Sequence, residues 1–227
     1  MIKEDLYYSP QEILEIFKEQ HRLCSPLDPR VNETFELTKE TLIIDWQDAQ
    51  DLLLWDDFGK FLNQEFRIEV SKEEWKLILT PETKKTIWDV CQFLAKMAIK
   101  EKVRPVKILG QECLSAAVFL TLKKNLQKKG VDVSGLKPST LISEFLEEDK
   151  NYSPLIEEAT LTGVRTFDKL EFGQLKTERI LKYFVDRFFP NLIYKRPIET
   201  GKVKTFRDLV ERIIENKELG TTTAKKH

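Results

Sequence analysis

The sequence is nearly devoid of histidine, with only His21 and His227 among its 227 residues. Composition alone therefore excludes most histidine-based metal sites and acid–base pairs. Glycine is also scarce, at eight residues, and no glycine-rich phosphate-binding loop is present. The three cysteines, Cys24, Cys91 and Cys113, lie far apart and form no CxxC pair. This pattern indicates reduced, mostly buried thiols in a cytoplasmic protein.

The sequence also lacks long apolar runs and an excess of either charge. No run approaches the roughly 18 apolar residues of a membrane helix, and the first eight residues lack the apolar core of a signal peptide. Lys+Arg number 37 and Asp+Glu 38, so no basic excess attracts nucleic acid. We therefore expect a cytoplasmic protein that has neither a membrane nor a nucleic acid as its partner. The hydrophobic fraction of 41% is sufficient for one large or two smaller folded domains.

Most of the local sequence patterns in the chain are signals for the start of a helix. In each, a hydroxyl side chain and a carboxylate three residues later can satisfy the free amides of a first helical turn, and an apolar stripe of helical period follows. Four such signals occur, at Ser9–Glu12, Ser71–Glu74, Thr86–Asp89 and Thr205–Asp208. Two longer helices are predicted over residues 45–66 and 111–129, the second ending at Gly130. Short strands are conceivable at 106–109 and 192–194 without changing the class.

One segment occurs twice. Leu37-Thr-Lys-Glu-Thr41-Leu-Ile-Ile-Asp45-Trp46 matches Leu136-Lys-Pro-Ser-Thr140-Leu-Ile-Ser-Glu144-Phe145 without a gap. A threonine-capped helix follows each copy, 45 residues after Thr41 and 65 after Thr140. We interpret this as a duplicated unit in which the second copy has about 20 extra residues, within 147–170. A chance match between common helix caps is the alternative.

The duplication predicts an all-α fold of two tandem four-helix modules. Their expected bounds are 1–103 and 104–219, followed by a disordered tail over 220–227. The order within each half is a helix, a long loop containing Thr-Leu-Ile, a helix, a short helix and a threonine-capped last helix.

This order resembles the acyl carrier protein family. The resemblance covers residues 10–100 and, more loosely, 110–216. The residues that carry it are Leu37-Thr38 and Thr41-Leu42 in the loop, Asn63–Ile68 at the end of the second helix, and Thr86–Val90 at the start of the last one. It implies a small four-helix bundle in each half.

The resemblance also implies an attachment site that this chain lacks. Carrier proteins hold phosphopantetheine on the serine of an Asp-Ser-Leu triplet, at a helix N-terminus whose amides favour a phosphate. Here the corresponding residues are Asp51-Leu52-Leu53 or Asp48-Ala49-Gln50, and no serine occurs between Ser25 and Ser71. The nearest candidate cofactor-binding residue in the second half is Ser153. Its other interpretation is a helix N-cap before a proline at the first helical position.

Two further groups were candidates for chemistry. Asp45, Asp48 and Asp51 recur every third residue on the predicted second helix, near Trp55, and could hold a cation or bind a basic protein partner. A solvated helix face is the alternative. Cys113 and Ser115 are close together in the sequence, but His21 is the only internal histidine that could activate either as a nucleophile. We interpret His21 instead as a half-exposed residue of an amphipathic helix. The four tryptophans are expected in the core, with one surface anchor among them.

The sequence therefore predicts a non-catalytic helical module that binds another protein and holds no cofactor and no metal. Two alternatives stay open: a functional carrier modified at Ser153, and an enzyme whose carboxylates converge from distant helices. An isolated, desolvated carboxylate in a deep polar cleft would favour the enzyme, and an apolar surface patch would favour the binding module.

Overall fold

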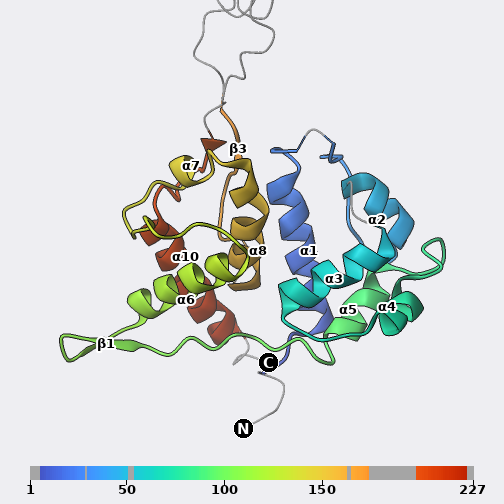
Figure 1. The fold of residues 1–227 in the computed structure, drawn as a ribbon, viewed down its shortest axis with the longest axis horizontal. Helices are drawn as coiled ribbons and strands as arrows, with labels where there is room; N and C mark the ends of the chain where they lie inside the picture. Colours follow the sequence, from blue (N-terminus) through green and yellow to red (C-terminus); the bar gives the residue numbers. More distant parts are fainter. Residues whose placement is uncertain (1–5, 29, 51–53, 163–164, 174–197, 224–227) are drawn as a thin grey trace, which may run out of the picture.

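Helices make up most of the protein. The computed structural model describes residues 6–28, 30–50, 54–162, 165–173 and 198–223 (Figure 1). Besides helices, these residues contain two small antiparallel sheets of two strands each. The predicted mainly α-helical class is confirmed.

The first part of the chain forms helices where the capping boxes predict them. The helices are α1 (Pro10–Cys24), α2 (Ile43–Gln50), α3 (Trp55–Phe66), α4 (Lys72–Leu79) and α5 (Ile87–Leu94). Reciprocal capping boxes begin α1, α4 and α5, and their N-cap residues are Ser9, Ser71 and Thr86. Each cap satisfies amide groups that would otherwise lack partners at the helix start.

The single helix predicted over residues 45–66 is wrong, because α2 and α3 are separate helices. The buried side chains explain the break. Trp46 and Ala49 of α2 and Phe58 and Leu62 of α3 are all buried. At 100° per residue, a continuous helix would place these two pairs on nearly opposite faces. Only an interruption of the helix lets both pairs enter one core. The backbone of Leu54, just before α3, is not helical and has a φ of −56° and a ψ of 156°.

The second part begins with a hairpin. Strands β1 (Val106–Ile108) and β2 (Gln111–Cys113) pair antiparallel, so the predicted short strand at 106–109 is confirmed. The helix predicted from residue 111 starts only at Leu114, because β2 occupies the three residues before it. This helix is α6 (Leu114–Lys128), and Gly130 follows it with a φ of 82°, the left-handed conformation that ends helices.

The remaining elements are α7 (Ile142–Phe145), a 3₁₀ turn (Asp149–Asn151), α8 (Tyr152–Thr162), β3 (Glu171–Phe172), β4 (Ile198–Glu199) and α10 (Phe206–Thr223). Helix α10 continues to Thr223, into the segment 220–227 for which disorder was expected. The candidate strand at 192–194 lies outside the described residues.

The buried hydrophobic residues form two clusters. One joins α1 to α2, α3, α4 and α5. The other joins α6, α7, α8, β4 and α10. Leu23 at the end of α1, and Leu27 in the turn that follows it, belong to the second cluster. Helix α1 thus contacts both cores, and Figure 1 shows it beside α8 in the middle of the molecule.

The first Thr-Leu-Ile segment is held against the start of α5. The Ile43 amide donates to the Lys85 carbonyl over 2.9 Å, and the Ile87 amide donates to the Thr41 carbonyl over 2.9 Å. The Thr41 hydroxyl accepts from the Thr38 amide over 2.9 Å.

The second Thr-Leu-Ile segment makes the same bonds with the start of α10. The Ile142 amide donates to the Lys204 carbonyl over 2.9 Å, and the Phe206 amide donates to the Thr140 carbonyl over 3.2 Å. The Thr140 hydroxyl accepts from the Lys137 amide over 3.0 Å. The residues matched by sequence therefore have matching local structure.

Candidate partner-binding surface

Two of the predicted acidic residues lie on the surface of α2. Asp45 and Asp48 are exposed, and neither forms an ion pair within the part of the chain that the structure describes. Asp51, the third member of the predicted row, lies outside the described residues. Because α2 ends at Gln50, the row is not continued by Asp56 and Asp57, which belong to α3.

Asp56 and Asp57, at the start of α3, form ion pairs within the chain. Asp56 binds Lys72 over 2.6 Å, and Asp57 binds Lys60 over 2.7 Å. The hydrogen bond from Lys72 lowers the pKa of Asp56. Asp45 and Asp48 are therefore more available to a basic partner.

The start of α3 exposes apolar side chains. Leu54 exposes 75% of its surface at the start of α3. Trp55 is half-buried, and the Lys72 ammonium lies 5.3 Å from the centre of its ring. Exposed apolar side chains, and exposed carboxylates that form no ion pair among the described residues, both occur at protein-binding surfaces.

The other tryptophans lie mainly in the core. Trp46 and Trp75 are buried. Trp88 is half-buried and has the Lys39 ammonium 4.3 Å above its ring. Trp55 and Trp88 are thus the two tryptophans that reach the surface, and Trp55 is the one beside Leu54.

Ser153 is exposed in the first turn of α8. The predicted alternative, an N-cap before a proline, is wrong, because α8 already begins at Tyr152 and Ser153 is its second residue. Its hydroxyl is accessible near a helix N-terminus, as attachment to a phosphate would require. Pro154 in the same turn removes one of the amides that such a phosphate would use.

Cys113 and Ser115 contact each other without a catalytic base. Their Sγ and Oγ atoms are 3.4 Å apart, and the hydrogen bond from Ser115 lowers the pKa of the Cys113 thiol. His21, the only candidate base, is 6% exposed, so the half-exposed position predicted for it is wrong. It packs edge-on against Phe35, and burial lowers the pKa of its imidazole. Among the described residues, no hydrogen bond or ring contact joins His21 to either side chain.

The structure also contains a buried carboxylate that sequence reasoning missed. Glu65 of α3 is 1% exposed and accepts a hydrogen bond from Gln20 of α1, but its second oxygen has no partner among the described residues. Burial, together with the charge of Glu157, raises the pKa of Glu65 to about 8. Lys129 ion-pairs with Glu157 and partly offsets this shift.

An ion-pair network continues from this carboxylate across the contact between the two parts. Glu158 of α8 is 1% exposed and binds Arg67 over 3.0 Å. Arg67 also binds Glu101 over 2.7 Å, and Lys129 lies 3.5 Å from Glu158. A sequence signal existed, since Glu65 adjoins the apolar stripe of Leu62 and Phe66. A charged residue beside buried apolar positions indicates that a partner for the charge is buried with it.

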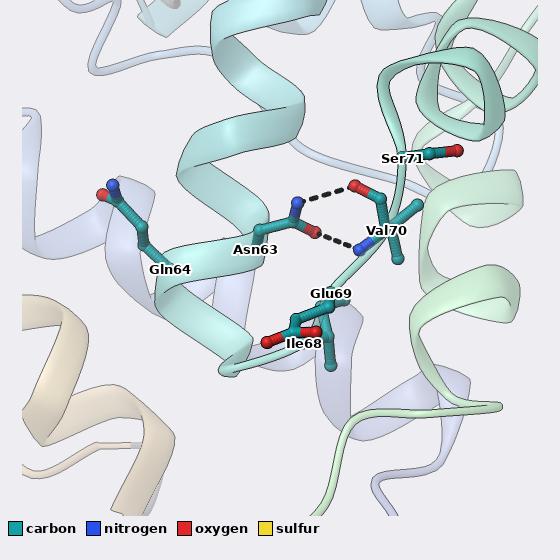
Figure 2. A pocket seen from close by; sticks show the side chains of 6 residues that line it. All are labelled: Asn63, Gln64, Ile68, Glu69, Val70 and Ser71. Carbon is teal, nitrogen blue, oxygen red and sulfur yellow. Dashed lines mark hydrogen bonds between the residues drawn. The ribbon is translucent and has the colours of Figure 1, made fainter.

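A pocket among the described residues does not include the carboxylate cluster. It is an open depression at the end of α3, lined by Asn63, Gln64, Ile68, Glu69, Val70 and Ser71 (Figure 2). The side-chain amide of Asn63, which lines this depression, is already hydrogen-bonded to the backbone of Val70. It donates to the Val70 carbonyl over 2.8 Å and accepts from the Val70 backbone N–H over 3.2 Å. Asn63 also accepts a hydrogen bond from the Trp75 indole over 3.0 Å, so its role is to hold the α3–α4 connection.

Metal-binding and membrane-spanning features are not found in the described part. No group of three or more histidine, cysteine or acidic residues there is arranged to hold a metal ion. Among the described helices, none combines the length and apolarity needed to cross a membrane. Comparison with protein families, curated proteins and solved structures gave no match.

Proposed function

We propose that this protein is a non-catalytic, helical protein-interaction module that resembles acyl carrier proteins but lacks their phosphopantetheine site. Its binding surface is the exposed face of α2 and the start of α3, with Asp45, Asp48, Leu54 and Trp55. The observation that carries the proposal is the combination of two exposed carboxylates, which form no ion pair with any described residue, and a leucine that is 75% exposed. The partner surface is basic and has an apolar centre.

The repeated structure supports the carrier-like part of the proposal. We propose that the two halves are copies of one helical unit, since both Thr-Leu-Ile segments form the same bonds with the start of a last helix. In this register Asp45 and Asp48 correspond to Glu144 and Glu147, which are also exposed.

A carrier modified at Ser153 is the second candidate, because the serine is exposed in the first turn of a helix. The enzyme alternative has less support. Glu65 is a desolvated carboxylate, but within the described residues no deep cleft leads to it.

Photo-crosslinking tests the proposed surface. A photoreactive amino acid replaces Asp48 in one variant and Glu147, its counterpart, in a matched control. We expect discrete protein adducts from position 48, falling by roughly tenfold when Asp45→Lys is added, as a lost favourable contact of ~1.4 kcal/mol would give. Equal adducts from positions 48 and 147, or adducts insensitive to Asp45→Lys, would rule out this surface.

A further inference from the structure

Buried polar side chains join α3 of the first hydrophobic cluster to α8 of the second. Glu65 of α3, and Glu158 and Thr160 of α8, are each 1% exposed. Helix α1 lies beside α8 in Figure 1, and its Gln20 donates hydrogen bonds to both Glu65 and Thr160. The contact of α8 with α1 and α3 therefore contains charges and hydrogen bonds where a protein interior is usually apolar.

The charges at this contact do not balance when every group is ionised. The charged groups that meet there are Glu65, Glu101, Glu157, Glu158, Arg67 and Lys129. Lys129 pairs with Glu157 and lies 3.5 Å from Glu158. Arg67 binds Glu158 over 3.0 Å and Glu101 over 2.7 Å. Four carboxylates thus face two cations, and Glu65 is the carboxylate that forms no ion pair with a described residue.

Glu65 also has little hydrogen bonding to support a negative charge. One of its oxygens accepts from Gln20, and the other has no partner among the described residues. A buried carboxylate without a cation is unfavourable, so such a site favours the protonated form. Burial and the charge of Glu157 accordingly raise the pKa of Glu65 to about 8. Geometry and charge both favour a neutral Glu65 while α8 is packed against α1 and α3.

We propose that the contact of α8 with α1 and α3 is proton-sensitive and opens when Glu65 loses its proton. The neutral side chain fits the closed contact. The carboxylate favours an open one, in which water reaches it, because no cation inside the closed contact compensates its charge. This inference goes beyond the proposed function, since it concerns how the two parts of the chain are held together and not the surface around α2.

The direction of the pH dependence follows from linkage. When α8 separates, the pKa of Glu65 returns from about 8 towards its ordinary value of 4.5. Between these values opening releases a proton, so the open fraction rises as the pH increases. The stabilisation of the closed form is complete below the ordinary pKa and is lost as the pH rises through the raised one.

Other groups facing Glu65 or its neighbours come from each element packed there. They are Gln20 and Cys24 of α1, Glu157 and Glu158 of α8, Lys129 after α6, and Arg67 after α3. Burial raises the pKa of Glu157 as well, although its ion pair with Lys129 opposes the shift. The variant Glu65→Gln leaves all of these groups in place, so it separates the effect of Glu65 from that of Glu157.

The three cysteines can report on this contact separately. Cys24 is half-buried at the end of α1, where burial and the charges of Glu157, Asp28 and Glu65 raise the pKa of its thiol to about 12. Cys91 is 0% exposed in the first cluster, and Cys113 is half-exposed just before α6. Opening of the contact increases the reactivity of Cys24 alone. Unfolding of the first cluster also exposes Cys91.

Maleimide labelling from about pH 6 to about pH 8, read for each cysteine by peptide mass spectrometry, tests the inference. The ratio of Cys24 to Cys113 labelling corrects for the effect of pH on the reagent. We expect this ratio in the wild type, divided by that in Glu65→Gln, to rise by roughly tenfold or more over this range. Cys91 stays unlabelled. Glu69→Gln changes an exposed carboxylate beyond the end of α3 and should retain the wild-type rise.

Three results would overturn the inference. One is a wild-type ratio that does not rise with pH, which requires no variant to fold. Another is an equal rise in the wild type and in Glu65→Gln. The third is labelling of Cys91 together with Cys24, which would show unfolding of the first cluster instead of separation at the contact.

Discussion

The Gly59→Ala protein is expected to lose roughly 3 kcal/mol or more of unfolding free energy, a large effect for one methyl group. Gly59 is buried on α3, where it faces Trp75 of α4. A Cβ atom at this position would lie 2.6 Å from Cγ and 2.7 Å from Cδ1 of the indole, well inside van der Waals contact.

The indole has no room to move away. Its Nε1 donates to Asn63 over 3.0 Å, and its ring packs against Phe93 with 5.3 Å between ring centroids. Helices α3 and α4 must therefore separate to accept the methyl group. Urea denaturation followed by circular dichroism measures the loss. Gly135→Ala is the matched control, because nothing lies within 4 Å of its added Cβ. Equal stability of the two variants would contradict the described packing of α3 on α4.

The Glu65→Gln protein is expected to become more stable than the wild type as the pH rises. The pKa of Glu65 is raised from its ordinary value of 4.5 to about 8 in the folded protein. Between these values the folded state binds a proton that the unfolded state has lost, so this group's stabilisation falls as pH increases. Glutamine cannot ionise. The stability of the variant relative to wild type should therefore rise by on the order of 3 kcal/mol from pH 5 to pH 8.

The groups facing Glu65 determine how this experiment is read. Gln20 donates to it from α1, Glu157 and Glu158 face it from α8, and Lys129 lies close by. All four remain in the variant, so the difference between the two proteins isolates Glu65. Glu69→Gln, which changes an exposed residue just beyond the end of α3, is the control and should not reproduce the gain in stability. Parallel stability curves for Glu65→Gln and wild type would show that Glu65 is ionised in the folded state.

Local signals were the most reliable part of the sequence analysis. The capping boxes at Ser9, Ser71 and Thr86 each start a helix, because the cap interactions involve only residues three apart. The matched Thr-Leu-Ile segments also make matching hydrogen bonds, although their partners are distant in sequence. The break between α2 and α3 was missed, since no glycine or proline lies between Gln50 and Trp55 and only the position of the core forbids a continuous helix.

The site was less predictable than the fold. Asp45 and Asp48 were identified from spacing, but spacing could not show that they form no ion pair with a described residue while Asp56 and Asp57 pair with Lys72 and Lys60. The buried carboxylate Glu65 was missed because its environment comes from α1, α6 and α8, which no local pattern reveals. Exposure of Leu54 and Leu109 likewise follows from tertiary packing.

The central claim, that this is a binding module without an attached prosthetic group, is tested most directly by intact mass. The chain is co-expressed with a broad-specificity phosphopantetheinyl transferase, alongside Ser153→Ala and the control Ser139→Ala, which changes another exposed serine. We predict unmodified masses for all three proteins. A shift of one phosphopantetheine in the wild type and in Ser139→Ala, absent from Ser153→Ala, would contradict the claim and identify the protein as a functional carrier.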